Sequence, residues 1–220
     1  MTHTGLLPQE WLMDYAAGSL NEAHAMVVAC HLQYHKNLQD DLRAAEDLGG
    51  DLLMSNQPEK MAADSLDKVL SRLDAGEAEP IEVQRSTPSE MPTDVPAPLQ
   101  KYLKNGLSDC KWRIMGPGMR QMKLWSGEKG ECLWLLKAKG GTQIPVHDHK
   151  GLEMTLILKG SYHVGDEHYT PGLLEMADQD HHSHQPVIDE GEDCICLVAT
   201  EAPIKIHSLV GRMLQPLIGL

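Results

Sequence analysis

The fold of this chain is decided by residues 141–160, which read Gly141-Thr-Gln-Ile-Pro-Val-His147-Asp-His149-Lys-Gly-Leu-Glu153-Met-Thr-Leu-Ile-Leu-Lys-Gly160. His147 and His149 are two residues apart, so in a strand both side chains point to the same face. Glu153 lies an even number of positions further on and can reach the same point. Two imidazoles and one carboxylate that converge inside a β-structure form a ligand set for a divalent metal ion.

A fourth ligand is expected from a strand that pairs further downstream, in residues 177–187. Three histidines lie in this region, His181, His182 and His184. The spacing alone does not choose among them, so at this level all three are candidates for the fourth position.

Composition and charge exclude several classes of protein. The chain has 220 residues, enough for one large or two small domains, and a net charge of −13. This charge argues against nucleic acid as a direct partner and suits a partner with a basic surface. No apolar stretch approaches the length of a membrane span. Five cysteines without a C-x2-C pair, and no signal peptide, indicate a reduced, cytoplasmic chain.

Residues 1–75 have helical periodicity and predict four short amphipathic helices that pack as a small bundle. The first helix begins at Pro8, which suits a first turn, and ends at Gly18. Ser19 and Glu22 have the spacing of a capping box, which would open the second helix. A bundle of this size buries little surface and should gain stability from a metal or a partner.

The third and fourth helices are predicted from two further apolar patterns. The third ends at residues 49–50, a pair of glycines, and the fourth begins near Asp64 or Ser65 and ends at Gly76. The fourth helix is expected to bury four apolar residues, Leu66, Val69, Leu70 and Leu73.

Residues 76–97 contain four prolines and many polar residues, which predicts an extended, mobile linker. After it the pattern changes to short strands separated by Gly and Pro turns, which is typical of an antiparallel barrel or jelly roll. The strands are expected at 111–115, 119–125, 132–138, 154–158, 161–164, 173–176 and 193–200.

The pattern G-x5-H-x-H-x3-E-x6-G in residues 141–160 fits the first cupin motif at every fixed position, and the second motif is degenerate. A helical region joined to one cupin resembles the ChrR-type zinc anti-sigma factors, over nearly the whole chain. The matching words are Tyr15-Ala-Ala-Gly18, Val27-Val-Ala, His31-Leu32, Gly151-Leu-Glu153-Met-Thr-Leu156, Ala177-Asp-Gln179 and Asp193-Cys-Ile-Cys-Leu197.

The resemblance implies a domain order and a function. Residues 1–75 would form a helical anti-sigma domain that binds an extracytoplasmic-function sigma factor, and residues 98–220 an all-β cupin. The cupin would be needed for release of the sigma factor under oxidative stress, from singlet oxygen or organic hydroperoxide. No direct contact with nucleic acid or a membrane is implied, and a homodimer through the cupin stays open.

The same resemblance assigns the cupin ligands to His147, His149, Glu153 and His184, with His182 as the alternative for the last. One zinc ion per chain is the metal that it implies. Iron, manganese and nickel are the alternatives, because histidine–carboxylate sites accept these ions too.

The helical part departs from the family's zinc motif, H-x3-C-x2-C. His31 is kept, but His35 stands at the first cysteine and Leu38 at the second. A structural zinc site needs four ligands, usually rich in thiolate. We therefore expect a metal-free helical domain in which Leu38 fills the former site. The alternative is a residual site formed by His3, His31 and His35.

Two further interpretations concern the second half of the chain. Cys194 and Cys196 face the same way on one strand, and we interpret them as buried barrel residues rather than as an oxidant-sensing pair. The alternative function is a metal-dependent cupin enzyme, an oxygenase or hydrolase acting on a small molecule. The tethered helical domain favours the regulatory protein, because an enzyme does not need it.

Overall fold

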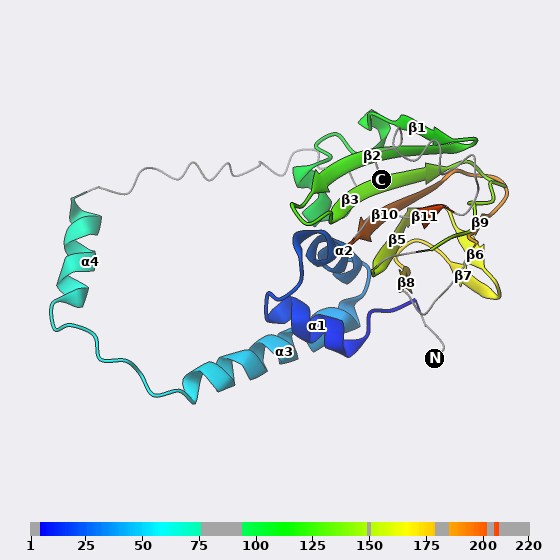
Figure 1. Cartoon of the computed structure of the whole chain (residues 1–220). Coiled ribbons are helices and arrows are strands. Elements are labelled where there is room, and N and C mark those ends of the chain that lie inside the picture. The colour runs from blue at the N-terminus through cyan, green and yellow to red at the C-terminus, as the bar shows by residue number, and fades with distance from the viewer. Residues whose placement is uncertain (1–4, 76–93, 149–150, 179–184, 202–204, 207–220) are drawn as a thin grey trace.

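The computed structural model describes residues 5–75, 94–148, 151–178, 185–201 and 205–206. Its first part is helical, as predicted, and the helices lie in the expected places (Figure 1). They are α1 (Gln9–Ala16), α2 (Glu22–Leu32), α3 (Lys36–Met54) and α4 (Ser65–Asp74). None of the helices in the described ranges is long and apolar enough to span a bilayer.

Two of the predicted helix boundaries are wrong. Helix α2 is capped by Asn21, whose side chain accepts a hydrogen bond from the backbone N–H of His24, at 2.9 Å. Ser19, the predicted cap, instead donates to the backbone oxygen of Asp14, at 3.0 Å. Helix α3 continues through residues 49–50, because neither glycine there adopts a positive φ that would end it.

Helix α2 is the centre of the helical region. Its mean hydropathy is high and its apolar residues lie on all sides, which is typical of a buried helix. It contacts α1 and α3 on one side and strands β3, β5 and β10 on the other (Figure 1). One continuous core joins Val27 of α2 with Leu133, Leu156 and Leu197 of the sheet. Helix α2 therefore packs on the β-sheet, and the helical region shares its core with the sheet instead of forming a bundle around a core of its own.

Helix α4 stands apart from the other helices (Figure 1). Its start agrees with the prediction, but none of its residues is buried. The four apolar side chains expected in a bundle core are exposed, Leu66 by 68%, Val69 by 54%, Leu70 by 47% and Leu73 by 64%. The prediction that they are buried is wrong because no other described element covers this helix.

The second part consists of short antiparallel strands. Two 3-10 helices come first, η1 (Ala97–Lys101) and η2 (Leu107–Asp109). The strands are β1 (Arg113–Gly116), β2 (Met119–Ser126), β3 (Cys132–Ala138), β4 (His147–Asp148), β5 (Glu153–Lys159), β6 (Tyr162–Val164), β7 (Glu167–Tyr169), β8 (Leu174–Ala177), β9 (Val187–Ile188), β10 (Cys194–Thr200) and β11 (Lys205–Ile206). All seven strands predicted from the alternating pattern are present, and β4, β7, β9 and β11 lie outside those seven ranges.

Within the part of the chain that the structure describes, the strands form separate sheets and do not close into one hydrogen-bonded barrel. Among the described residues, the orders are β1-β2-β3-β10-β5-β8, β7-β6-β9 and β11-β4. A second core lies between the first two sheets and contains Trp134 and Ile157 from one and Tyr162 and Ile188 from the other. Two sheets that pack face to face around a shared core form a sandwich, so of the two predicted architectures, barrel and jelly roll, the arrangement is closer to the jelly roll.

The boundaries 1–75, 76–97 and 98–220 remain predictions, because residues 76–93 lie outside the described ranges. The last residues of the expected linker belong to the folded part. Val95 is buried, and the Asp94 carboxylate accepts a hydrogen bond from the backbone N–H of Leu107, at 3.1 Å.

Candidate functional site

His147 begins β4 and is buried, with 7% of its surface exposed. Its Nδ1 donates a hydrogen bond to the backbone oxygen of Pro145, at 2.9 Å. A carbonyl only accepts, so Nδ1 carries the proton and the lone pair of the neutral ring is on Nε2. A backbone carbonyl that fixes the tautomer in this way is the usual support of a histidine that binds metal.

Glu153 begins β5 and is also buried. Its Oε1 accepts a hydrogen bond from the Thr155 hydroxyl, at 3.2 Å. In the sheet Glu153 lies opposite Ala177, the last residue of β8. Strand β8 therefore leads from the side of Glu153 into residues 179–184, where the fourth ligand was predicted.

The other predicted ligands, His149 and His184, lie outside the described residues, as do His181 and His182. The structure therefore places two of the four, both buried. Their convergence with the remaining two stays a prediction.

The surroundings of Glu153 fit a cation. Glu175 is a second buried carboxylate, and the Tyr162 hydroxyl donates to it. Burial raises the pKa of Tyr162, and the charges of Glu175 and Glu153 raise it further, so these groups share one interior. No lysine or arginine is buried among the described residues. Buried carboxylates need positive charge or protons, and a metal ion held by His147 and Glu153 would supply that charge.

Two thiols lie in the same interior. The sulfur atoms of Cys194 and Cys196 are 3.6 Å apart, and both side chains are buried. The hydrogen bond with Cys194 and burial raise the pKa of Cys196 well above its ordinary value. A protonated thiol is a poor nucleophile, so the geometry favours our interpretation of the pair as buried barrel residues.

Two positions of the expected zinc motif in the helical region, His31 and Leu38, are buried. The backbone N–H of Leu7 donates to Nε2 of His31, at 3.3 Å, and Leu38 is buried beside this core. Burial and the neighbouring His35 lower the pKa of His31 to about 4. No third His, Cys, Asp or Glu in the described ranges completes a ligand group with His31 and His35. His3 lies outside those ranges.

His35 connects the helical region to the β domain. Its Nε2 donates to the backbone oxygen of Gly172, which precedes β8, at 2.8 Å. Two residues further on, the N–H of Leu174 donates to the oxygen of Gly5, at 2.9 Å. We call these two contacts the His35–Gly172 joint. Sequence analysis missed it, because no local pattern pairs residues that are 137 positions apart.

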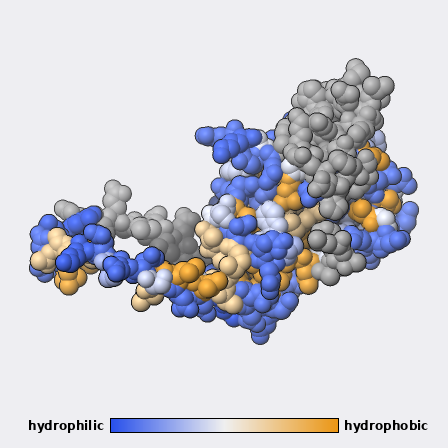
Figure 2. Space-filling model, turned by 60° about the horizontal axis from the view of Figure 1, so that its bottom comes forward, coloured by the Kyte–Doolittle hydropathy of each residue, from blue (hydrophilic) through white to orange (hydrophobic). Residues whose placement is uncertain are grey.

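An exposed apolar surface lies at the opposite end of the helical region. Figure 2 shows hydrophobic residues along the arm formed by α3 and α4. The exposed large apolar residues of this arm are Leu48, Leu52, Leu53 and Met54 on α3 and Leu66, Val69, Leu70 and Leu73 on α4. These eight exposed apolar side chains lie on two helices, and exposed apolar surface of this kind marks protein interfaces.

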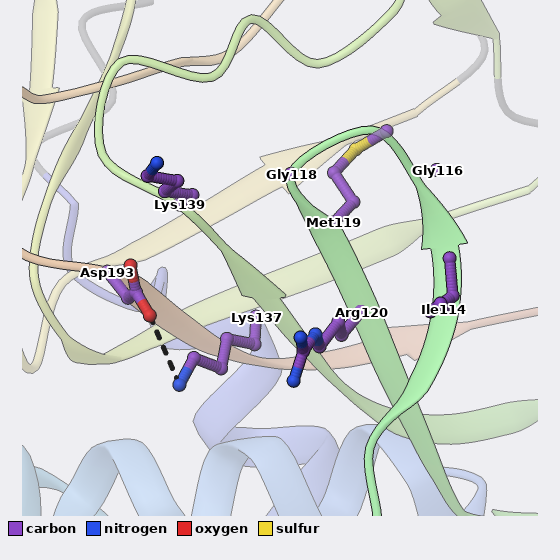
Figure 3. Close-up of a pocket in the computed structure, with 8 residues that line it drawn as sticks. All are labelled: Ile114, Gly116, Gly118, Met119, Arg120, Lys137, Lys139 and Asp193. Carbon is purple, nitrogen blue, oxygen red and sulfur yellow. Dashed lines mark ion pairs between the residues drawn. The ribbon is translucent and has the colours of Figure 1, made fainter.

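A separate hollow of about 420 Å³ lies on the outer face of β1, β2 and β3 (Figure 3). Arg120, Lys137 and Lys139 line it, and Lys137 forms an ion pair with Asp193, at 3.1 Å. Neither His147 nor Glu153, the two predicted ligands that the structure describes, lines this hollow.

The fold and the buried histidine and glutamate define a cupin-like β domain with a helical N-terminal region. The profile of the ChrR cupin-like domain matches residues 105–203. The chain is 38% identical over 206 residues to the anti-sigma-E factor ChrR of Cereibacter sphaeroides, and the match covers 93% of each chain.

A solved structure agrees with this match. The crystal structure of Rhodobacter sphaeroides SigE in complex with the anti-sigma ChrR superposes with a TM-score of 0.75 and 34% identity. The match covers 88% of this chain and 97% of that chain. The chain belongs to the ChrR family of anti-sigma factors.

Proposed function

We propose that this protein is an anti-sigma factor that sequesters an extracytoplasmic-function sigma factor through its helical region. In this account its cupin domain binds one zinc ion and releases the sigma factor under oxidative stress, from singlet oxygen or organic hydroperoxide. The protein acts by binding and not as an enzyme. Since sigma factors act on RNA polymerase, the proposed complex is cytoplasmic.

The observation that carries the proposal is the apolar arm of α3 and α4. Leu66 and Leu73 are more than half exposed on a helix that buries none of its residues. Burial of one such side chain contributes about 1.5–3 kcal/mol, so a partner that covers the arm gains several such contributions. The relative with this architecture was crystallised with a sigma factor, SigE.

The cupin would hold the metal through His147, His149, Glu153 and His184. The fixed tautomer of His147 and the buried carboxylate of Glu153 support this assignment. The helical region would need no metal, because Nε2 of His31 already accepts a hydrogen bond from the backbone N–H of Leu7. In addition, the buried Leu38 stands at a position where the family's motif has a cysteine.

Release requires a connection between the metal site and the helices, and β8 offers one. Its last residue pairs with Glu153, and the N–H of its first residue, Leu174, donates to the oxygen of Gly5 at the His35–Gly172 joint. A shift of β8 after a change at the metal would therefore reach the start of α3. Such a rigid element with partners at both ends is a physical route for coupling.

The test is complex formation between the full chain and an extracytoplasmic-function sigma factor of the same genome, measured by calorimetry. Leu66→Asp/Leu70→Asp should weaken binding by more than tenfold, because it places charges in an apolar interface. The matched control is Ile114→Asp on β1, which is 81% exposed and lies outside the arm. Unchanged affinity of the double variant, or equal loss in the control, would show that the arm is not the binding surface.

A further inference from the structure

Three side chains converge on the outer surface of the three-stranded sheet β7-β6-β9. His163 of β6 lies directly opposite His168 of β7, and their rings stack with centroids 4.2 Å apart and planes 8° from parallel. Asp189 follows β9, which pairs with the other edge of β6. Their ligand atoms all lie within 4.8 Å of one another, the only such group in the described part of the chain.

Both rings face the same carboxylate. Nδ1 of His163 is 2.7 Å from Oδ1 of Asp189, and Nε2 of His168 is 2.9 Å from Oδ2. Two nitrogens and a carboxylate bound to one ion at about 2.1 Å would be roughly 3.0–3.4 Å apart. The observed separations are slightly shorter than these values because the two nitrogens donate hydrogen bonds to Asp189. An ion would replace these two protons, and the nearly parallel rings would turn so that both nitrogen lone pairs point at it.

The carboxylate is held in place by the fold. The Ser161 hydroxyl donates to Asp189, and the N–H of Asp189 donates to the backbone oxygen of Ser161, at 3.1 Å. Burial acts to raise the pKa of Asp189, but the hydrogen bonds from Ser161, His168 and His163 together hold it below its ordinary value. The carboxylate is therefore ionised and oriented before any ligand arrives.

The strands beneath the cluster are rigidly packed. Tyr162, Tyr169 and Ile188 are the sequence neighbours of the three residues, and each is at most 4% exposed in the core between the sheets. The two histidines themselves are 46% exposed and Asp189 is 29% exposed. The backbone under the cluster is therefore held by buried side chains, while the cluster itself is open to solvent and to ions.

We propose that His163, His168 and Asp189 form a second metal site, which binds a divalent transition metal ion of the zinc, nickel or copper type. Imidazole nitrogens select these ions over calcium and magnesium, which prefer oxygen ligands. Three protein ligands leave positions for water, so the ion is exchangeable. The bound ion links the β6–β7 hairpin to the end of β9 and stabilises the three-stranded sheet β7-β6-β9.

The test is a titration of the full chain with Zn²⁺, with calorimetry and elemental analysis as readouts. The wild-type chain should bind one more ion than His163→Gln/His168→Gln and one more than Asp189→Asn. Glu190→Gln is the control, because this exposed carboxylate is adjacent in sequence but lies outside the group. The substituted side chains are on the surface, and circular dichroism verifies that each variant is folded.

A second readout uses the wild-type chain alone. Zn²⁺ should shift the imidazole resonances of His163 and His168 together, at the same concentration that gives the second calorimetric transition. Equal numbers of bound ions in the wild type and in both variants would overturn the proposal, as would a loss of the ion in Glu190→Gln. Sigma-factor binding is not part of this measurement, so its outcome is independent of the function proposed above.

Discussion

Removal of the His35 side chain should loosen the joint between the helices and the β domain. His35→Ala deletes the donor to the oxygen of Gly172, a bond of 2.8 Å. The lost hydrogen bond is worth about 0.5–1.5 kcal/mol, and leaving the buried Gly172 carbonyl without a donor raises the cost to about 1–3 kcal/mol. In a chain of this size that lowers the melting temperature by roughly 2–4 °C for each kcal/mol.

Urea unfolding of the full chain measures this loss. His35→Gln should recover part of it, because the amide nitrogen of glutamine can donate to the same carbonyl. Lys36→Ala is the matched control, an exposed neighbour at the start of α3. If β8 couples the metal site to the helices through this joint, the His35→Ala protein should still bind the sigma factor but should release it less completely on oxidation. If His35→Ala and Lys36→Ala are equally stable within about 0.5 kcal/mol, the joint does not hold the two parts together.

Three further predictions follow from the buried histidines and thiols. The pKa of His31 is lowered to about 4, so between pH 7 and pH 5 the unfolded chain takes up a proton that the folded chain excludes. The free energy of unfolding should therefore fall by about 2 kcal/mol over this range. Urea unfolding at both pH values measures the fall, which should be smaller in His31→Gln. His147→Ala should lose the tightly bound ion, and elemental analysis that finds it retained would remove this ligand from the assignment. Cys194→Ala/Cys196→Ala should still release the sigma factor on oxidation, since both thiols are buried and the pKa of Cys196 is raised by its hydrogen bond with Cys194 and by burial; a variant that no longer responds would make them the sensor.

The strands were predictable because their signals are local. Alternating apolar residues and Gly or Pro turns gave all seven predicted strands, and the His-x-His-x3-Glu spacing placed His147 and Glu153, both of which are buried. Strands of two or three residues, such as β7 and β11, are too short for a periodic pattern and exist only through their partners.

The arrangement of the helices was not predictable from periodicity. An apolar stripe indicates that one face of a helix is suited to burial, but it does not indicate which other element packs against that face. Helix α2 is apolar all round and packs on the sheet, whereas α4 has the same kind of stripe as a bundle helix and leaves Leu66 and Leu70 exposed. The cluster of His163, His168 and Asp189 was not predictable either, because strand pairings between distant segments bring these residues together and no local sequence pattern shows such pairings.

The central claim is tested most directly by transcription in vitro from a promoter of the cognate extracytoplasmic-function sigma factor. Purified full-length protein should reduce sigma-dependent transcripts to near background at one chain per sigma factor, and an organic hydroperoxide should restore them. Leu66→Asp/Leu70→Asp should fail to inhibit, while Ile114→Asp inhibits as the wild type does. Transcript levels that stay unchanged with excess wild-type protein would contradict the account.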